Sequence, residues 1–451
     1  MSAPSSARPT ARRHPRVAVV GGGLAGITAA LRLADAGCRV TLHEAKPKLG
    51  GLTHSFPRDL GDERLWVDNG QHVFLRCCTS YRALLDRLGV TGQVTIQDRL
   101  DVTVLSGAYV GTGRLRRSGL PAPLHLGAAL ATYRWLSPLD RLKVVPAALA
   151  LGRVDRKAPV TDDQSFGDWL ARHGQSDRAV EAVWDLIGVA TLNAPAARSS
   201  LALAATVFQL GLLDEPGAAD IGWSDVPLQQ LHGDAAAKAL ADAGVDVRLG
   251  AKVVSLDDLD AEAVVVATTA PEAARLAGDV IPDAHPADWA DELGSAPIIN
   301  LHLVYDRTVL DEPFVAAVDS PLQWVFDRTA HAGLRQGQYV AVSISAADQL
   351  VDLPVATLRE RFVPHVEAVL PRARDAELRD FFVTRERHAT FRPAPGSGRL
   401  RPATRTTSAR VYLAGAWTAT GWPATMEGAV RSGEAAADAL LETRSPLEVG
   451  A

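Results

Sequence analysis

A glycine-rich turn stands near the start of the chain, where residues 21–26 read GGGLAG. The apolar run RVAVV precedes it and the apolar run ITAALRLADAG follows it, as a strand and a buried helix would. In such a turn Gly21 allows the sharp bend, Gly23 lets an anion reach the backbone, and Gly26 lets the helix pack closely on the strand. The N–H groups at the helix start would then hold the pyrophosphate of a dinucleotide. The predicted contacts are Gly21, Gly23, Leu24, Ala25 and Gly26.

An acidic residue stands where such a nucleotide would need one. Glu44 follows Gly26 by 18 residues and ends the next β-rich run, RVTLHE. A carboxylate at that point accepts hydrogen bonds from both ribose hydroxyls of an adenosine and disfavours a 2′-phosphate. The motif by itself does not separate FAD from NAD.

Other catalytic patterns are missing from the sequence. No Ser-His-Asp arrangement and no HExxH motif is visible, so hydrolase and metalloenzyme hypotheses have no support. The three cysteines, Cys38, Cys77 and Cys78, are too few for a disulfide framework and match no zinc spacing. We interpret them as buried apolar residues of a protein in a reducing cytosol.

The elements that must position these residues follow a mixed α/β pattern. Residues 17–44 predict a strand, a helix and a parallel strand, which is the βαβ unit. Runs with the same buried-strand character recur around 245–269 and at 410–416, so three separated blocks should share one sheet. Between them, residues 106–224 are rich in helix formers, and residues 295–345 alternate like antiparallel strands.

We therefore predict an α/β fold with a Rossmann-like nucleotide-binding domain assembled from discontinuous segments and an inserted α+β substrate domain. The first domain is expected to comprise residues 16–105, 225–285 and 400–445, and the second residues 106–224 and 286–399. Residues 1–15 hold three arginines and no acidic residue, and we expect a flexible basic tail there.

The glycine turn, Glu44 and the later pair Gly50–Gly51 resemble the FAD-binding signature of the amine oxidase and phytoene desaturase superfamily. The resemblance implies an amine-oxidase-like fold with FAD as the cofactor. An arginine usually follows the paired glycines in that signature, and here Leu52 removes one countercharge to the phosphates. The further cofactor contacts that the resemblance implies are Ala45, Gly50, Gly51, Leu52, Gly70, Gln71 and Val253.

The C-terminal block, residues 413–440, also resembles that superfamily. It predicts a helix from about Ala424 to Leu440 with Pro423 at its first turn, and the positive end of this helix would favour the anion of a reduced flavin. Where the superfamily has Gly-Asp, with the acid on the ribityl chain, this chain has Gly415–Ala416. Thr418, Thr420 or a backbone group would have to replace the acid. The implied cofactor contacts are Gly415, Ala416, Ala424, Thr425 and Met426.

Further blocks resemble the bacterial hydroxysqualene dehydroxylases over about residues 16–440. They are DNGQH at 68–72, LNAP at 192–195, APIINLHLVYD at 296–306 and PATMEGAVRSG at 423–433. The resemblance implies a role in squalene and hopanoid synthesis, with a hydrophobic C30 isoprenoid as substrate. The implied reaction removes the allylic hydroxyl of hydroxysqualene reductively and gives squalene.

The resemblance also places His72 beside the flavin ring. We predict that His72 protonates the departing hydroxyl, and a satisfied structural histidine is the alternative. Two other functions stay open. One is a carotenoid (phytoene) desaturase or amine oxidase of the same superfamily, which would run the flavin in the oxidative direction. The other is a non-catalytic FAD-binding scaffold that partners an isoprenoid synthase, which Leu52 and Ala416 favour.

The charge and hydropathy of the chain limit the kinds of partner that it can bind. The net charge of −5 provides no attraction to nucleic acid. Residues 120–151 mix apolar side chains with basic ones, which fits either a membrane-surface face or helices packed within the substrate domain. The apolar run from Leu201 to Leu213 is too short to span a bilayer. We expect a cytoplasmic protein, with peripheral contact to the inner membrane face and association with a squalene-synthase-like enzyme as open alternatives.

Overall fold

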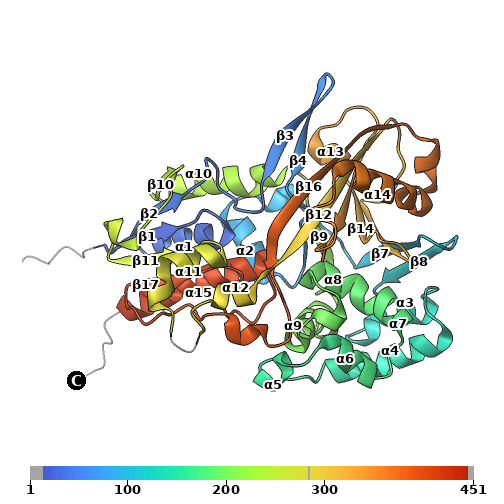
Figure 1. Cartoon of the computed structure of the whole chain (residues 1–451), viewed down its shortest axis with the longest axis horizontal. Coiled ribbons are helices and arrows are strands. Elements are labelled where there is room, and N and C mark those ends of the chain that lie inside the picture. Colours follow the sequence, from blue (N-terminus) through green and yellow to red (C-terminus); the bar gives the residue numbers. More distant parts are fainter. Residues whose placement is uncertain (1–13, 283–284, 445–451) are drawn as a thin grey trace, which may run out of the picture.

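A five-stranded parallel sheet forms one end of the molecule in the computed structural model, which describes residues 14–282 and 285–444 (Figure 1). Its strand order is β10-β2-β1-β11-β17, and every neighbouring pair is parallel. The strands are β1 (Arg16–Val20), β2 (Arg39–Glu44), β10 (Asp246–Leu249), β11 (Ala263–Val266) and β17 (Val411–Leu413). The three separated blocks therefore share one sheet, and the predicted α/β class is confirmed. The expected basic tail lies outside the described residues except for His14 and Pro15.

Helices from both ends of the chain pack together beside this sheet. They are α1 (Leu24–Asp35), α2 (Thr79–Arg87), α10 (Ala235–Asp242), α11 (Ala270–Ala277), α12 (Trp289–Leu293) and α15 (Met426–Arg444). A Cβ on Gly433 of α15 would lie 2.2 Å from the carbonyl oxygen of Ala25 in α1. Only glycine permits that approach, which brings the C-terminal helix against the glycine turn.

A seven-stranded, mostly antiparallel sheet forms the second layer, in the order β16-β12-β15-β14-β13-β7-β8. Its strands are β7 (Asp101–Ser106), β8 (Thr112–Arg116), β12 (Ser295–Tyr305), β13 (Phe314–Val318), β14 (Trp324–Asp327), β15 (Gln338–Ile344) and β16 (Leu378–Phe391). The long strands β12 and β16 run from this sheet toward the centre of the molecule (Figure 1). The expected boundary at residue 105 falls inside β7, which belongs to this sheet, and the division into domains stays a prediction.

Smaller elements connect the two sheets. A hairpin pairs β3 (Ser55–Leu60) with β4 (Glu63–Asp68), and β9 (Ile221–Ser224) lies between β5 (Val73–Leu75) and β6 (Val94–Ile96). The remaining helices are α3 (Gly127–Thr132), α4 (Pro138–Leu151), α5 (Pro159–Asp162), α6 (Phe166–Arg172), α7 (Asp177–Ala179), α8 (Leu186–Leu192), α9 (Leu201–Phe208), α13 (Thr329–Ala332) and α14 (Val355–Val369).

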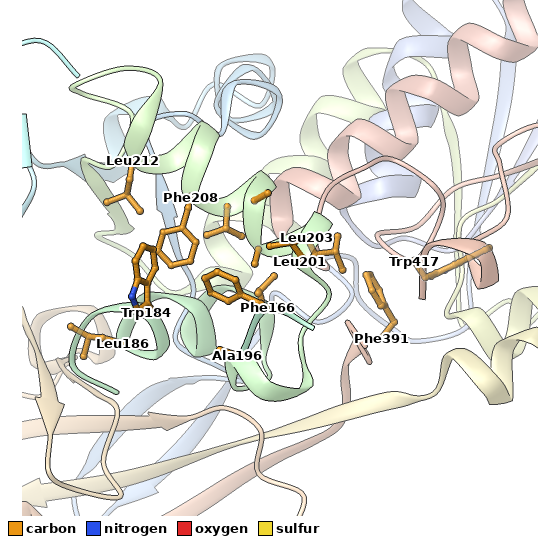
Figure 2. Packing of buried hydrophobic residues seen from close by; sticks show 14 of the residues in the cluster. Phe166, Trp184, Leu186, Ala196, Leu201, Leu203, Phe208, Leu212, Phe391 and Trp417 are labelled. Carbon is orange, nitrogen blue, oxygen red and sulfur yellow. The ribbon is translucent and has the colours of Figure 1, made fainter. Parts of the chain in front are cut away.

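An aromatic cluster fills the core beneath the helical region (Figure 2). The ring of Phe166 lies 5.9 Å from Trp184 and 5.6 Å from Phe208, and those two rings are 5.1 Å apart. Every residue of α9 is buried, as its apolar sequence predicts. The described residues contain no helix that combines the length and the apolar character required to cross a bilayer.

A buried carboxylate ties four segments of this region together. Asp220 accepts hydrogen bonds from Arg76 Nε at 2.9 Å, from Arg117 Nε at 2.6 Å and from the Leu100 backbone N–H at 2.7 Å. Burial raises the pKa of Asp220, but the hydrogen bonds from Arg117 and Arg76 outweigh that effect and hold the pKa below its usual value. The ionised form is therefore the one that the fold stabilises.

We expect Asp220→Ala to lower the free energy of unfolding by about 3 kcal/mol at neutral pH, because it leaves the partly buried guanidinium groups of Arg76 and Arg117 without their partner. The difference from the parent should stay constant between about pH 8 and pH 5 and shrink only below about pH 4, as the parent carboxylate becomes protonated. Urea titrations across pH measure it. The control Asp438→Ala, which breaks the exposed pair with Arg32, should change stability by less than about 1 kcal/mol. Equal losses in the two variants would contradict the assignment.

Candidate functional site

The glycine turn has the geometry that its spacing predicts. Gly21 has a φ of 110°, which glycine adopts without strain. A Cβ on Gly21 would lie 2.4 Å from the carbonyl oxygen of Ala267, at the end of β11. One on Gly26 would lie 1.9 Å from the carbonyl oxygen of Gly21. Strand β1, helix α1 and the end of β11 therefore meet only because these positions are glycine.

Helix α1 begins at Leu24 with its positive end available to an anion. Its N-cap is Gly23, which has no side chain to bind the first N–H groups, and the first turn holds no acidic residue. A Cβ on Gly23 would have a single heavy atom within 4 Å, the Cα of Gly51 at 3.8 Å. The N–H groups of Leu24, Ala25 and Gly26 have no acceptor inside the helix, so this end can bind a phosphate group.

Glu44 at the end of β2 connects the turn to the loop that follows. Its Oε2 accepts a hydrogen bond from the Gly22 N–H at 2.6 Å, and its Oε1 accepts one from the Lys46 N–H at 2.7 Å. Each oxygen keeps a further lone pair for a ribose hydroxyl. Ala45 follows Glu44 directly and precedes Lys46, so it stands beside the predicted adenosine contact.

The Gly50–Gly51 pair lies against the same turn. Both residues have positive φ, at 107° and 60°, and the Gly50 N–H donates to the carbonyl of Gly22 at 2.9 Å. Leu52 provides a carbonyl that accepts a hydrogen bond from the Asn69 side chain at 3.3 Å, which links this loop to Gly70 and Gln71. After β10, the Ala251 N–H donates to the Glu44 carbonyl at 2.9 Å, and Val253 is buried two residues later.

Arg401 organises the loop that contains Ala416. This arginine is 4% exposed, and its Nη2 donates to the carbonyls of Thr418 at 2.5 Å and Trp422 at 2.9 Å. It also reaches the Ala416 carbonyl at 3.2 Å. Burial lowers the pKa of Arg401 to about 10, which still leaves it charged at neutral pH. A cation therefore holds the loop in shape where the superfamily has an acid at position 416.

The two threonines considered as replacements for that acid already have partners. The Thr418 hydroxyl donates to the Gly415 carbonyl at 2.9 Å, and the Thr420 hydroxyl accepts from Arg401 at 3.3 Å. The Gly415 N–H donates to the Ser432 hydroxyl of α15 at 2.8 Å. These bonds fix the loop on the C-terminal helix, and Thr418, Thr420 and backbone groups all stay open as the replacement for the acid.

Helix α15 begins at Met426, two residues later than the sequence predicts. Thr425 is the reason, because its hydroxyl accepts a hydrogen bond from the Gly428 N–H at 3.1 Å and so occupies the N-cap position. Glu427, the second residue of the helix, is buried and accepts hydrogen bonds from the N–H groups of Ser80 at 3.2 Å and Tyr81 at 2.7 Å. Glu427 therefore caps helix α2 from the other end of the chain.

An apolar cavity lies between these segments and the second sheet. Its volume is about 210 Å³, and its walls come from β5, β7, α8, α9 and β13–β15. Leu186, Leu210, Phe314, Trp324 and Phe326 are among the apolar residues that line it. The same wall contains the predicted cofactor contacts Gln71, Thr425 and Met426, together with Glu427.

Gln71 faces this cavity with an amide that has no partner. Both Nε2 and Oε1 are buried, and neither forms a hydrogen bond with any residue that the structure describes. A buried primary amide without partners costs free energy unless a ligand binds it. The side chain is therefore suited to a polar group of a cofactor or substrate.

His72 is placed differently from its neighbours. Gln71 and Val73 line the cavity, whereas His72 is absent from the described residues that line it. Its Nδ1 lies 3.0 Å from the Gly70 carbonyl, so in the neutral ring Nδ1 carries the proton and Nε2 is an acceptor. Desolvation lowers the pKa of His72, which opposes the imidazolium form. The assignment of His72 as proton donor stays a prediction.

The blocks that carry the narrower resemblance have positions in the core. Asn193 ends α8 with a left-handed φ of 58°, and its Nδ2 donates to the Ala296 carbonyl of β12 at 3.0 Å. His302 of β12 is fully buried, and its Nδ1 bonds to the Tyr339 hydroxyl at 2.6 Å. Asn193 thus connects α8 to the second sheet, and His302 connects neighbouring strands within that sheet. Neither residue is among the described residues that line the cavity.

Comparison with known proteins identifies the family. A model of the family described as flavin containing amine oxidoreductase matches residues 24–441. The chain belongs to this family. It is 30% identical to the hydroxysqualene dehydroxylase of Rhodopseudomonas palustris, over 94% of this chain and 98% of the relative. It is 24% identical to a probable zeta-carotene desaturase of Synechococcus elongatus, over 95% and 99%.

The fold is also that of solved flavoproteins. A triple mutant of putrescine oxidase matches with a TM-score of 0.70 at 18% identity, over 95% of this chain and 99% of that one. The protein is an FAD-dependent oxidoreductase, as its sequence predicts. The described residues fit this cofactor, because the glycine cradle, the open end of α1, the lone pairs of Glu44 and the unpartnered amide of Gln71 all offer what a bound FAD would use.

Two site residues escaped sequence reasoning. Arg401 binds backbone carbonyls of a loop that only the folded chain assembles, so no motif marks it. Glu427 stands inside a recognised block, but its partners Ser80 and Tyr81 lie about 350 residues earlier, at separations of 347 and 346. Nothing in the local sequence indicates either contact.

We expect the purified protein to retain FAD, and Glu44→Ala to raise the dissociation constant of FAD at least about tenfold. The reason is the loss of charge-assisted hydrogen bonds of about 1.5 to 3 kcal/mol each, partly offset by water. Fluorescence titration of the apoprotein with FAD measures the change. Glu442→Ala, at the exposed end of α15, should leave the constant unchanged. Equal constants for Glu44→Ala and the parent would remove Glu44 from the site.

Proposed function

We propose that this flavoenzyme removes the allylic hydroxyl of hydroxysqualene reductively and releases squalene and water. The observation that carries the proposal is the mostly apolar cavity, whose wall also contains the expected cofactor contacts Gln71, Thr425 and Met426. Likeness to a hydroxysqualene dehydroxylase over almost the full length of both chains supports the same substrate class. A C30 chain would lie against the apolar walls, with its hydroxyl near these cofactor contacts.

The reaction needs a proton at oxygen and a hydride at carbon. Reduced FAD, when bound, supplies the hydride. Hydroxide leaves poorly, so a donor must reach the oxygen before the C–O bond breaks, and the carbon then acquires allylic cation character. The chain's part is to exclude water that would capture this cation, which the apolar walls do.

Three aromatic rings line the cavity in which we expect that cation to form. The centroid of Phe314 lies 6.0 Å from that of Trp324 and 6.1 Å from that of Phe326, and all three side chains line the cavity. The electron-rich faces of aromatic rings attract a cation without capturing it. This cluster supports a reaction that passes through positive charge in an apolar site.

The decisive experiment is anaerobic turnover of the reduced holoenzyme with a panel of hydroxysqualene, phytoene and amines. We expect hydroxysqualene alone to reoxidise the flavin, with squalene as the product. Dehydrogenation of phytoene or an amine by the oxidised enzyme, without squalene formation, would establish an oxidative member of the family instead. A holoprotein whose flavin responds to none of these compounds would be a scaffold.

The role proposed for His72 has a pH signature. If its imidazolium is the acid, the rate of single-turnover reoxidation by hydroxysqualene should rise as pH falls below about 6.5, because the lowered pKa keeps the ring neutral above that. His72→Ala should keep FAD bound, lose this pH dependence and slow the reaction about 100-fold to 10,000-fold. His72→Gln tests whether a neutral donor suffices. A parent rate in His72→Ala would show that the acid lies elsewhere.

The proposal also extends to the setting of the enzyme. We infer that it works in the cytoplasm, in agreement with the free thiols of Cys77 and Cys78, and that it meets its oily substrate at the inner face of the membrane. Supply of hydroxysqualene by a squalene-synthase-like enzyme fits this chemistry. Association between the two proteins is a proposal that pull-down of the holoenzyme would test.

A further inference from the structure

The segment between β7 and the end of α4 carries a charge opposite to that of the whole chain. Residues 106–154 contain seven arginines and lysines and one aspartate, while the net charge of the protein is −5. Arg114 and Arg116 pair with Asp101, and Arg117 pairs with Asp220. The other four form no salt bridge within residues 14–282 and 285–444: Arg134, Arg141, Lys143 and Arg153.

The same segment concentrates the exposed apolar side chains. Of the fourteen large hydrophobic residues that are exposed in the described part of the chain, eight lie between residues 109 and 149. They are Tyr109, Val110, Leu120, Leu124, Leu139, Leu142, Val145 and Leu149. Exposed hydrophobic residues scattered singly need no explanation, but a cluster of this kind marks an interaction surface.

Helix α4 shows how the two features are combined. At about 100° per residue, Leu139, Leu142, Val145 and Leu149 fall within an arc of about 120° on the exposed side. Val144, Ala147 and Leu151 are buried on the opposite side. Arg141 and Lys143 stand about 40° beyond the two edges of the exposed arc. An apolar stripe with a cation at each edge is the pattern of a helix that lies in a membrane surface.

This surface is continuous with the wall of the cavity. Leu115 of β8 lines the cavity, while its neighbours Arg114 and Arg116 point the other way toward Asp101. Helix α3 packs against both β8 and α4. Figure 1 shows β7, β8, α3 and α4 at the same end of the molecule.

We propose that residues 106–154 dock on a lipid bilayer with anionic headgroups, the apolar stripe of α4 entering the interface and the unpaired cations binding the headgroups. The positive charge of this surface favours an anionic bilayer as its partner. The protein as a whole is net acidic, with a charge of −5, so a basic patch with an apolar centre fits a negatively charged bilayer. The proposal rests on the exposed apolar and basic residues of this segment and does not depend on which substrate the enzyme uses.

Vesicle sedimentation of the FAD-loaded protein, without substrate, tests the proposal. The parent should bind vesicles with about 30% phosphatidylglycerol, bind pure phosphatidylcholine much less, and dissociate as salt is raised. Leu139→Glu/Leu142→Glu and Lys143→Glu/Arg153→Glu should each lower the partition coefficient at least about tenfold. All four positions are exposed and lie clear of the packed face, and flavin absorbance and thermal midpoint check that each variant folds.

Matched controls come from other faces of the same protein. Val355→Glu replaces an exposed apolar residue at the start of α14, and Lys238→Glu reverses an exposed charge on α10. Both should bind vesicles like the parent. Parent protein that stays in solution with anionic vesicles, or stripe variants that bind as well as the parent, would overturn the proposal. Binding that appears only when an isoprenoid synthase is added would also overturn it and assign the face to a protein partner.

Discussion

The docking of helix α15 against helices α1 and α2 is the contact on which the site depends. Glu427 has no exposed side-chain surface, and moving a carboxylate into such a position costs several kcal/mol unless it finds partners. It finds the first N–H groups of α2 and the guanidinium of Arg431 at 2.6 Å. The last helix of the chain must therefore be in place before Thr425, Met426 and Glu427 can line the cavity.

That seating also explains why cofactor and substrate would meet at one place. The glycine turn lies on α1, the loop of Ala416 precedes α15, and the cavity is floored by residues of both α15 and the segment before α2. Gly433 allows α15 to touch α1, and Thr425 ends the loop by capping the helix. A displacement of α15 would thus open the nucleotide site and the cavity together.

The parts of the fold that could be predicted are those whose pattern is local. Strands β1 and β2 begin and end where RVAVV and RVTLHE do, because apolar periodicity and the glycine turn fix them within thirty residues. Strand β16 escaped prediction, since LRDFFVTRERHATF is rich in charge and becomes a strand by pairing with β12. Arg401 and Glu427 could not be predicted either, because their roles depend on partners that only the folded chain brings together. The glycine contacts could be predicted, because their pattern is local.

Three histidines, His232, His302 and His331, lie outside the described residues that line the cavity. Desolvation lowers the pKa of His232 and of His302 to about 3 and that of His331 to about 4, so all three rings are neutral at physiological pH. A fixed positive charge about 6 Å from an allylic cation would cost about 3 kcal/mol at an effective dielectric constant of about 20, or roughly a hundredfold in rate. Neutral imidazoles add no such charge to the core, and two of them satisfy the hydroxyls of Tyr81 and Tyr339. A donor that starts as imidazolium becomes neutral once its proton has moved to the leaving oxygen. Its positive charge is therefore gone from the site by the time the allylic cation has formed.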